Sequence, residues 1–186
     1  MNRLFLSFAI LAICFTSCKK EQDPFKIGKQ HIGPLTDSTQ VKDLKSIFSK
    51  DSISTFKNGK AFSGAINTID IFDKNGDKLL VLSPRNISDS TSVIGSVQIM
   101  DSRYKTKEGI STLSTFKDIN DTYKISRINN LINSVVISVN EINATFTIDK
   151  KELPANLRFD KNITIEAIHI PDDAKIKYFF INWNNQ

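Results

Sequence analysis

Apolar and polar residues alternate along much of the chain after residue 65, and this two-residue period predicts β-strands. Residues that favour turns separate the alternating stretches, as in antiparallel sheets. Helical spacing, with apolar residues three and four positions apart, is found in two stretches. The alternating stretches are residues 65–84, 91–105, 133–149, 162–170 and 174–183.

The first hairpin is predicted by its turn. Asn75-Gly76 is a strong two-residue turn signal, because both residues tolerate the positive φ of a type I′ turn. This turn makes one face of the hairpin apolar by pairing Ile71 with Leu80 and Ile69 with Leu82.

A second hairpin is predicted near the C-terminus. Pro171 to Ala174 form a good four-residue turn between residues 162–170 and 174–183.

Before these strands, Asp149 can cap a short helical turn with Glu152 reaching back to it.

The two helical stretches begin alike. Residues 38–48 and 114–132 each start with Ser-Thr, and Thr115 has Asp118 three residues later, which indicates an N-cap. The apolar positions at helical spacing are Val41, Leu44, Ile47 and Phe48 in the first, and Phe116, Ile119, Tyr123 and Ile128 in the second.

These elements predict an α+β fold, a mostly antiparallel sheet with one or two short packed helices. The segments that start at Gly33 and Gly109 share a pattern of Gly, Ser-Thr, hydrophobic-Lys-Asp and an aromatic residue. We therefore expect residues 27–186 to form one α+β domain. The shared pattern reflects either two related halves, 27–100 and 101–186, that arose by tandem duplication, or helix-start chemistry common to both segments.

The N-terminus has the pattern of an export signal. Arg3 precedes an apolar run from Leu4 to Phe15, which is shorter than the roughly 20 residues that span a bilayer. The following Phe15-Thr16-Ser17-Cys18 resembles the lipobox of lipoproteins of Gram-negative bacteria. The alternative is an ordinary signal peptide cut near Ser17.

The resemblance implies a signal peptide over residues 1–17, acyl chains such as palmitate on Cys18, and a tether over residues 18–26 in contact with the membrane. Lys19 occupies the position where Asp retains lipoproteins at the inner membrane, so it implies the outer membrane, on its periplasmic or cell-surface side. The charged residues after Cys18 are either an export signal or a solvated tether.

The same processing removes thiol chemistry from the mature chain. Cys14 leaves with the signal peptide and Cys18 carries lipid, and the chain has two cysteines in all. Disulfides, thiolate metal sites and cysteine nucleophiles are therefore not expected.

Residues 106–123, "TKEGISTLSTFKDINDTY", resemble an element of β-lactamase-inhibitor-like proteins and of small outer-membrane-assembly lipoproteins. In those proteins the element leads into a helix packed on a curved antiparallel sheet. The resemblance implies a binding or scaffolding role.

Composition argues against nucleic acid as a partner. The formal net charge is +5, but the basic residues are scattered, with pairs such as Lys150-Lys151 as the longest groups. The strand-like placement of Trp183 and the phenylalanines favours a core over base stacking.

Candidate catalytic chemistry is sparse, and we predict no enzyme, cofactor or metal. His31 and His169 lack the spacing of a zinc site. Asp73, Asn75 and Asp77 resemble the start of a calcium loop, but Gly76 is fourth and Pro84 stands where the bidentate Glu belongs. Three Asp-Ser sites suit either caps and turns or bacterial glycosylation: Asp37-Ser38-Thr39, Asp51-Ser52-Ile53 and Asp89-Ser90-Thr91.

The sequence thus predicts an outer-membrane lipoprotein that binds or scaffolds an envelope protein or glycan. One alternative is an enzyme inhibitor that uses the loop tips at Asn75-Gly76 and residues 140–143. The other is a hydrolase, which a deep pocket with two carboxylates, or a histidine beside a hydroxyl, would favour.

Overall fold

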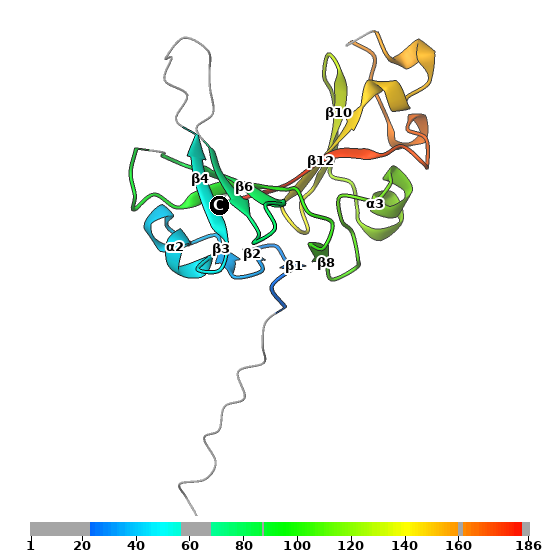
Figure 1. Ribbon diagram of the computed structural model, residues 1–186. Coiled ribbons are helices and arrows are strands. Elements are labelled where there is room, and N and C mark those ends of the chain that lie inside the picture. The colour runs from blue at the N-terminus through cyan, green and yellow to red at the C-terminus, as the bar shows by residue number, and fades with distance from the viewer. Residues whose placement is uncertain (1–22, 57–67, 87, 160–161, 184–186) are drawn as a thin grey trace, which may run out of the picture.

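The computed structural model describes residues 23–56, 68–86, 88–159 and 162–183. An antiparallel sheet of eight strands, ordered β4-β5-β6-β7-β12-β11-β10-β9, curves through the molecule. Both α-helices and a small sheet of four strands, ordered β3-β2-β1-β8, lie on its convex side (Figure 1). This is the α+β fold, dominated by antiparallel sheet, that the sequence predicts.

The strands of the large sheet come from both halves of the chain. Buried residues alternate with partly exposed ones most clearly in the strands Ile94–Ile99, Ser134–Val139 and Ala144–Asp149, which gives each of these one core-facing side. The strands are β4 (Ser52–Phe56), β5 (Thr68–Phe72), β6 (Lys78–Pro84), β7 (Ile94–Ile99), β9 (Arg127–Asn130), β10 (Ser134–Val139), β11 (Ala144–Asp149) and β12 (Ile176–Asn182).

The remaining elements are short. The small sheet contains β1 (Lys26–Ile27), β2 (His31–Ile32), β3 (Leu35–Thr36) and β8 (Lys105–Thr106), and its β1 and β8 are parallel. The helices are α2 (Leu44–Ile47) and α3 (Phe116–Thr122) with the 3₁₀ turns η1 (Val41–Asp43), η2 (Lys150–Glu152), η3 (Ala155–Leu157) and η4 (Ala167–His169).

The predicted register of the first hairpin is confirmed. Ile71 pairs with Leu80 and Ile69 pairs with Leu82. The turn itself is different from the predicted type I′, because Gly76 has a positive φ of 86° whereas Asn75 does not. The Asp73 carboxylate accepts the N–H groups of Asn75 and Asp77 at 2.8 and 3.1 Å, which holds a longer loop.

Each predicted helical stretch contains a helix, and one has the predicted cap. The second helix is shorter than predicted, because α3 ends at Thr122 and Ile128 lies in β9, which pairs with β10. Thr115 and Asp118 make a reciprocal capping box at the start of α3. The first helix is a 3₁₀ turn continued by one turn of α-helix, and no side chain caps it. Asp149 caps η2 through the N–H of Lys151, but Glu152 does not reach back and instead accepts the N–H of Lys175.

The predicted C-terminal hairpin is wrong. Residues 162–170 do not form a strand, and η4 occupies Ala167–His169. β12 pairs with β11 on one side and β7 on the other, so both of its edges are occupied. The predicted tether also ends earlier than residue 26, since Lys26 lies in β1 and the Phe25 ring packs edge-on against Tyr104 at 5.1 Å.

The two halves of the chain have corresponding strand order, and their origin by duplication stays a prediction. Strands β4 to β7 and β9 to β12 are arranged symmetrically about the β7–β12 pair. In each half the residue before the helix bridges the residue before the last strand, Gln40 to Val93 and Thr115 to Lys175. Gly33 and Gly109, the first residues of the shared pattern, both have positive φ.

The core is continuous across the two halves. Trp183 is fully buried, as predicted, and its indole N–H donates to the carbonyl of Lys29 at 3.0 Å. The Arg85 guanidinium donates to the Trp183 carbonyl at 2.6 Å. The end of β12 is thereby bonded to the loop between β1 and β2 and to the residue that follows β6.

Candidate functional site

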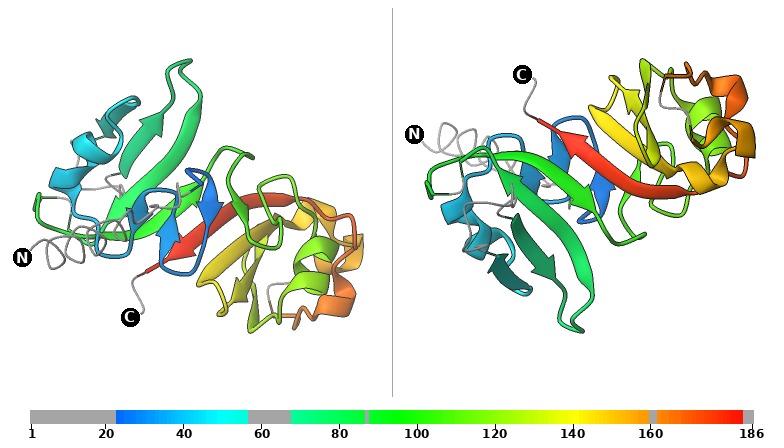
Figure 2. Two further views of the ribbon diagram at one scale, coloured as in Figure 1. Left: turned by 90° about the horizontal axis from the view of Figure 1, so that it is seen from below. Right: turned by 90° about the horizontal axis from the view of Figure 1, so that it is seen from above.

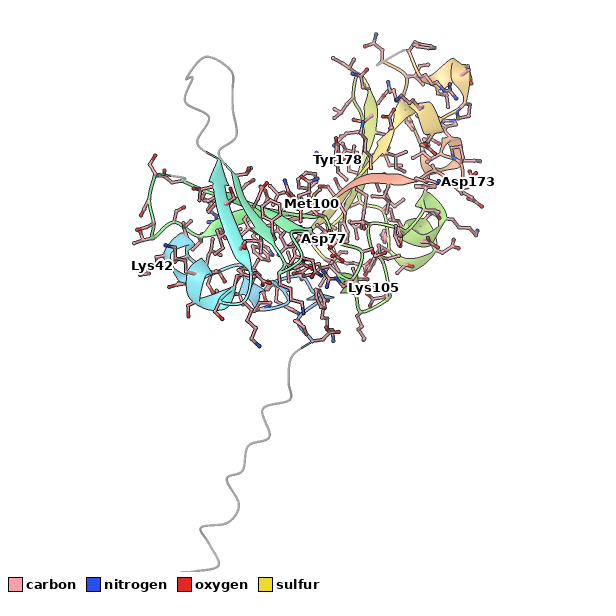
Figure 3. The ribbon with its side chains drawn as sticks, viewed as in Figure 1. Lys42, Asp77, Met100, Lys105, Asp173 and Tyr178 are labelled. Atoms are coloured by element: carbon pink, nitrogen blue, oxygen red, sulfur yellow. The ribbon has the colours of Figure 1, made fainter. Side chains whose placement is uncertain are left out.

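The concave face of the large sheet is the main candidate site. Seen from above, the strands β7 and β12 cross the middle of the molecule, and the helices lie behind or beside the sheet (Figure 2). The outward side chains along this seam are Gln98, Met100, Tyr178 and Phe180, and Phe180 pairs with Gln98. Tyr178 and Met100 are 43% and 41% exposed, and Figure 3 shows them near each other over the central strands.

Aromatic and hydroxyl groups dominate the face around the seam. The Tyr178 and Phe180 rings meet edge to face with centroids 6.4 Å apart. On β11, Thr145 and Thr147 stand opposite Phe180 and Tyr178. An amphipathic aromatic cluster surrounded by hydroxyl groups suits recognition of a partner surface better than burial in a core.

Each half adds one ion pair to the face. In the first half, Lys78 Nζ forms an ion pair with the Asp70 carboxylate at 2.5 Å, and Asp70 is 3% exposed. The same Nζ lies 5.3 Å from the centroid of the Phe72 ring.

In the second half, Lys177 Nζ bonds to Asp149 at 2.9 Å and lies 5.6 Å from the Tyr178 ring centroid. The hydrogen bond from Lys177 lowers the pKa of Asp149, and the same bond raises the pKa of Lys177. Because these charges are paired, the two ion pairs add no net charge to the face.

A cavity of about 480 Å³ opens on the convex side, beside the first described residues. Its walls include Asp51, Asp73, Arg103 and Tyr104. Burial, followed by the nearby Asp73 charge, raises the pKa of Asp51. Burial, and then Asp51, also raises the pKa of the Tyr104 hydroxyl.

The two aspartates in this cavity do not form a free catalytic pair. The hairpin turn uses one Asp73 oxygen, and Arg103 donates to the other at 3.1 Å. Among the described lining residues, Asp51 is therefore the one carboxylate that remains available, whereas glycoside hydrolysis requires two.

The histidines have structural environments. His169, predicted in a strand, lies at the end of η4, where its Nδ1 accepts the N–H of Glu166 at 3.1 Å. His31 lies in β2, and its ring packs against Gly28 so closely that a Cβ there would be 2.3 Å from the ring. No hydroxyl within the described ranges hydrogen-bonds to either histidine ring.

The other predicted sites have separate outcomes. Cys18, the predicted lipidation site, lies outside the described residues. Asp89 caps its own turn by accepting the N–H and hydroxyl of Thr91 at 2.8 and 2.6 Å. Among the described residues, no three His, Cys, Asp or Glu side chains could hold a metal ion together, and no helix is long and apolar enough to cross a membrane.

Sequence reasoning did not find the concave face as a site. The alternation predicts strands that contain Tyr178 and Met100, but the proximity of these two residues depends on β7 pairing with β12, and no local pattern indicates that pairing. Alternation alone showed which residues share a face of one strand.

Comparison with known proteins adds information on the fold alone. No protein-family model matches the chain, and no curated protein matches it. Among solved structures, the uncharacterized protein YfeY from Escherichia coli is similar in fold, with a TM-score of 0.53 and 14% sequence identity. The match covers 84% of this chain and 99% of YfeY.

Proposed function

We propose that this protein is a lipoprotein, anchored in the outer membrane through Cys18, that binds a protein partner of the cell envelope on the concave face of its large sheet. The uncovered seam between β7 and β12 carries this proposal. Its exposed Tyr178 and Met100 belong to the residue types enriched in protein interfaces.

The position of the face suits a tethered binding protein. The described chain begins beside β1 on the convex side, opposite the concave face (Figure 1). A tether that enters there leaves the concave face turned away from the anchoring membrane. Paired charges on the face favour a partner surface without strong net charge over an acidic or basic one.

Site-directed photocrosslinking in intact cells tests the proposal. A benzophenone amino acid replaces Tyr178 in one strain and Leu113 in a control strain. Leu113 is 79% exposed and lies before α3, away from the concave face. We expect a single, near-stoichiometric protein adduct from position 178 that is lost when Met100→Ser is added, and no such adduct from position 113.

Membrane fractionation of the same strains tests the anchor. Cys18→Ala should move the protein from the membrane to the soluble fraction and abolish labelling with a palmitate analogue. Unchanged labelling would refute the anchor. Absence of a protein adduct from position 178, or adducts with glycan strands instead, would refute a protein partner.

A further inference from the structure

A second cavity, of about 540 Å³, lies at the far end of β10 and β11. Basic side chains dominate its wall: Lys150, Lys151, Arg158 and Lys177. Asp149 is the one acidic side chain among the described residues of the wall, and that carboxylate already accepts Lys177 Nζ at 2.9 Å and the N–H of Lys151 at 3.0 Å. The cavity therefore has a strong excess of positive charge.

Lys150 is the unusual member of this group. The alternation of β11 continues beyond Ile148 and places Lys150 on the core-facing side, where it is 4% exposed. Its Nζ is buried and has no hydrogen-bond partner among the described residues. An ammonium has three N–H donors, and burying them without an acceptor is costly. Lys150 lines the cavity, and an anion bound there would supply the missing acceptor once the Nζ group turns toward it.

The Arg158 side chain is also oriented to bind an anion. Its Nε donates to the carbonyl of Leu153 at 2.7 Å, which orients the guanidinium. Its terminal N–H groups make no hydrogen bond within the described ranges, and a guanidinium binds phosphate or carboxylate oxygens with two parallel bonds.

The rim of the cavity is apolar. Phe159 and Ile132 are 91% and 75% exposed, which is unusual for side chains of this size. Phe159 follows η3 and Ile132 lies in the β9–β10 turn, and both line the cavity beside the basic wall. A ligand that neutralises the lysines and also covers these two side chains must be both anionic and apolar.

We propose that this cavity binds a phosphate monoester that carries an apolar group. A monoester has close to two negative charges at neutral pH and three acceptor oxygens, which matches several donors better than a carboxylate does. Lys150 and Arg158 contact the phosphate, and Phe159 packs against the apolar group. The ligand is either a lipid headgroup or a soluble phosphorylated compound.

Calorimetric titration of the purified soluble protein, which begins after Cys18, tests the site with hexyl phosphate, inorganic phosphate and hexanol. We expect hexyl phosphate to bind at least tenfold more tightly than inorganic phosphate, and hexanol not to bind. Lys150→Met should weaken hexyl phosphate binding at least tenfold, whereas Lys45→Met, at an exposed site on α2, should leave it unchanged.

Stability measurements separate binding from folding. Lys150→Met replaces an unpaired buried charge with an apolar side chain of similar length, so its thermal midpoint should not fall. Arg158→Gln provides a second variant with a more exposed side chain. No saturable binding of hexyl phosphate to the wild type, or wild-type affinity in both variants, would overturn the proposal.

Vesicles identify the source of the ligand. Binding to phosphatidylcholine vesicles that contain phosphatidic acid, but not to phosphatidylcholine alone, assigns a lipid headgroup. Binding of hexyl phosphate without vesicle binding assigns a soluble compound. Lys150→Met should leave crosslinking from position 178 intact, so this site and the concave face can fail independently.

Discussion

At the scale of single residues, Arg103 joins three parts of the chain. Its Nε and Nη2 donate to the Asp101 carboxylate at 2.7–3.1 Å, and Nη2 also reaches Asp73 in the first hairpin turn. The guanidinium carbon lies 4.8 Å from the centroid of the Phe25 ring. The start of the fold is thus held by charge as well as by packing.

This arrangement predicts a pH-dependent effect of Arg103→Gln. The hydrogen bonds from Arg103 hold the pKa of Asp101 below its ordinary value of 3.8. A carboxyl group whose pKa is lower in the folded than in the unfolded protein stabilises the fold at pH values above its ordinary pKa. This contribution is lost as the pH falls through the pKa of the folded state. The variant should therefore be less stable than wild type at pH 7, and the difference should shrink below pH 4.

Urea denaturation at pH 7 and pH 3, with carbon NMR titration of Asp101, measures both effects. Arg127→Gln, at an exposed position on β9, is the control and should change neither. A stability difference that is equal at both pH values would show that Arg103 acts through packing alone.

Lys150 illustrates what sequence reasoning misses at this scale. Lys150-Lys151 reads as an ordinary exposed pair, because lysine is seldom buried. The two-residue period of β11 runs one position farther than its apolar residues and carries Lys150 to the core-facing side. Extending the period past Ile148 would have identified it.

At the scale of elements, the hairpin tips of the two halves each contain one residue with a positive φ. The β5–β6 tip has Gly76 at a φ of 86°, and the β10–β11 tip has Asn143 at a φ of 53°. Glycine and asparagine are the residues that adopt this conformation most readily. The first tip was predictable because its chemistry is local.

Substitution of Gly76 tests the role of the positive φ. A Cβ at Gly76 would meet no atom within 4 Å, so the cost of Gly76→Val is that of the positive φ alone. We expect the free energy of unfolding to fall by about 1–2 kcal/mol. Gly76→Asn should cost clearly less, because asparagine tolerates this conformation. Equal urea denaturation midpoints for the two variants would contradict the explanation.

The failed C-terminal hairpin shows where local patterns stop being informative. Residues 162–170 alternate as β12 does, and a good turn joins the two segments. Pairing is decided instead by competition for β12, and β7 and β11 occupy both of its edges. The concave face could not be predicted for the same reason, because it is formed by the pairing of β7 with β12, which are far apart in the sequence.

At the scale of the whole molecule, the β7–β12 seam unites the two halves. Residues Phe179 to Asn182 pair with residues 96–99, and the small sheet adds a second link where β1 pairs with β8. Trp183 closes the seam with no exposed surface. One core spanning both halves should unfold as a unit.

Trp183→Ala tests this unity. Loss of a buried indole should lower the free energy of unfolding by roughly 3–5 kcal/mol for the entire chain. Leu113→Ala, at an exposed site, should change it by less than about 0.5 kcal/mol. In the wild type, urea curves from Trp183 fluorescence and far-ultraviolet circular dichroism should coincide, and two separate transitions would show independent halves.

The central place of β12 also affects how the molecule is made. Before residues 176–182 emerge from the ribosome, β7 has β6 as its one neighbour in the sheet, and nothing reaches the Lys29 carbonyl from Trp183. At about 5–20 residues per second, the wait between β7 and β12 is roughly 4–15 s. Pairing of such distant segments is slow even after both are present. The sheet that joins the two halves therefore cannot be completed until residues 176–182 have been made, so β7 keeps one edge unpaired for several seconds of synthesis.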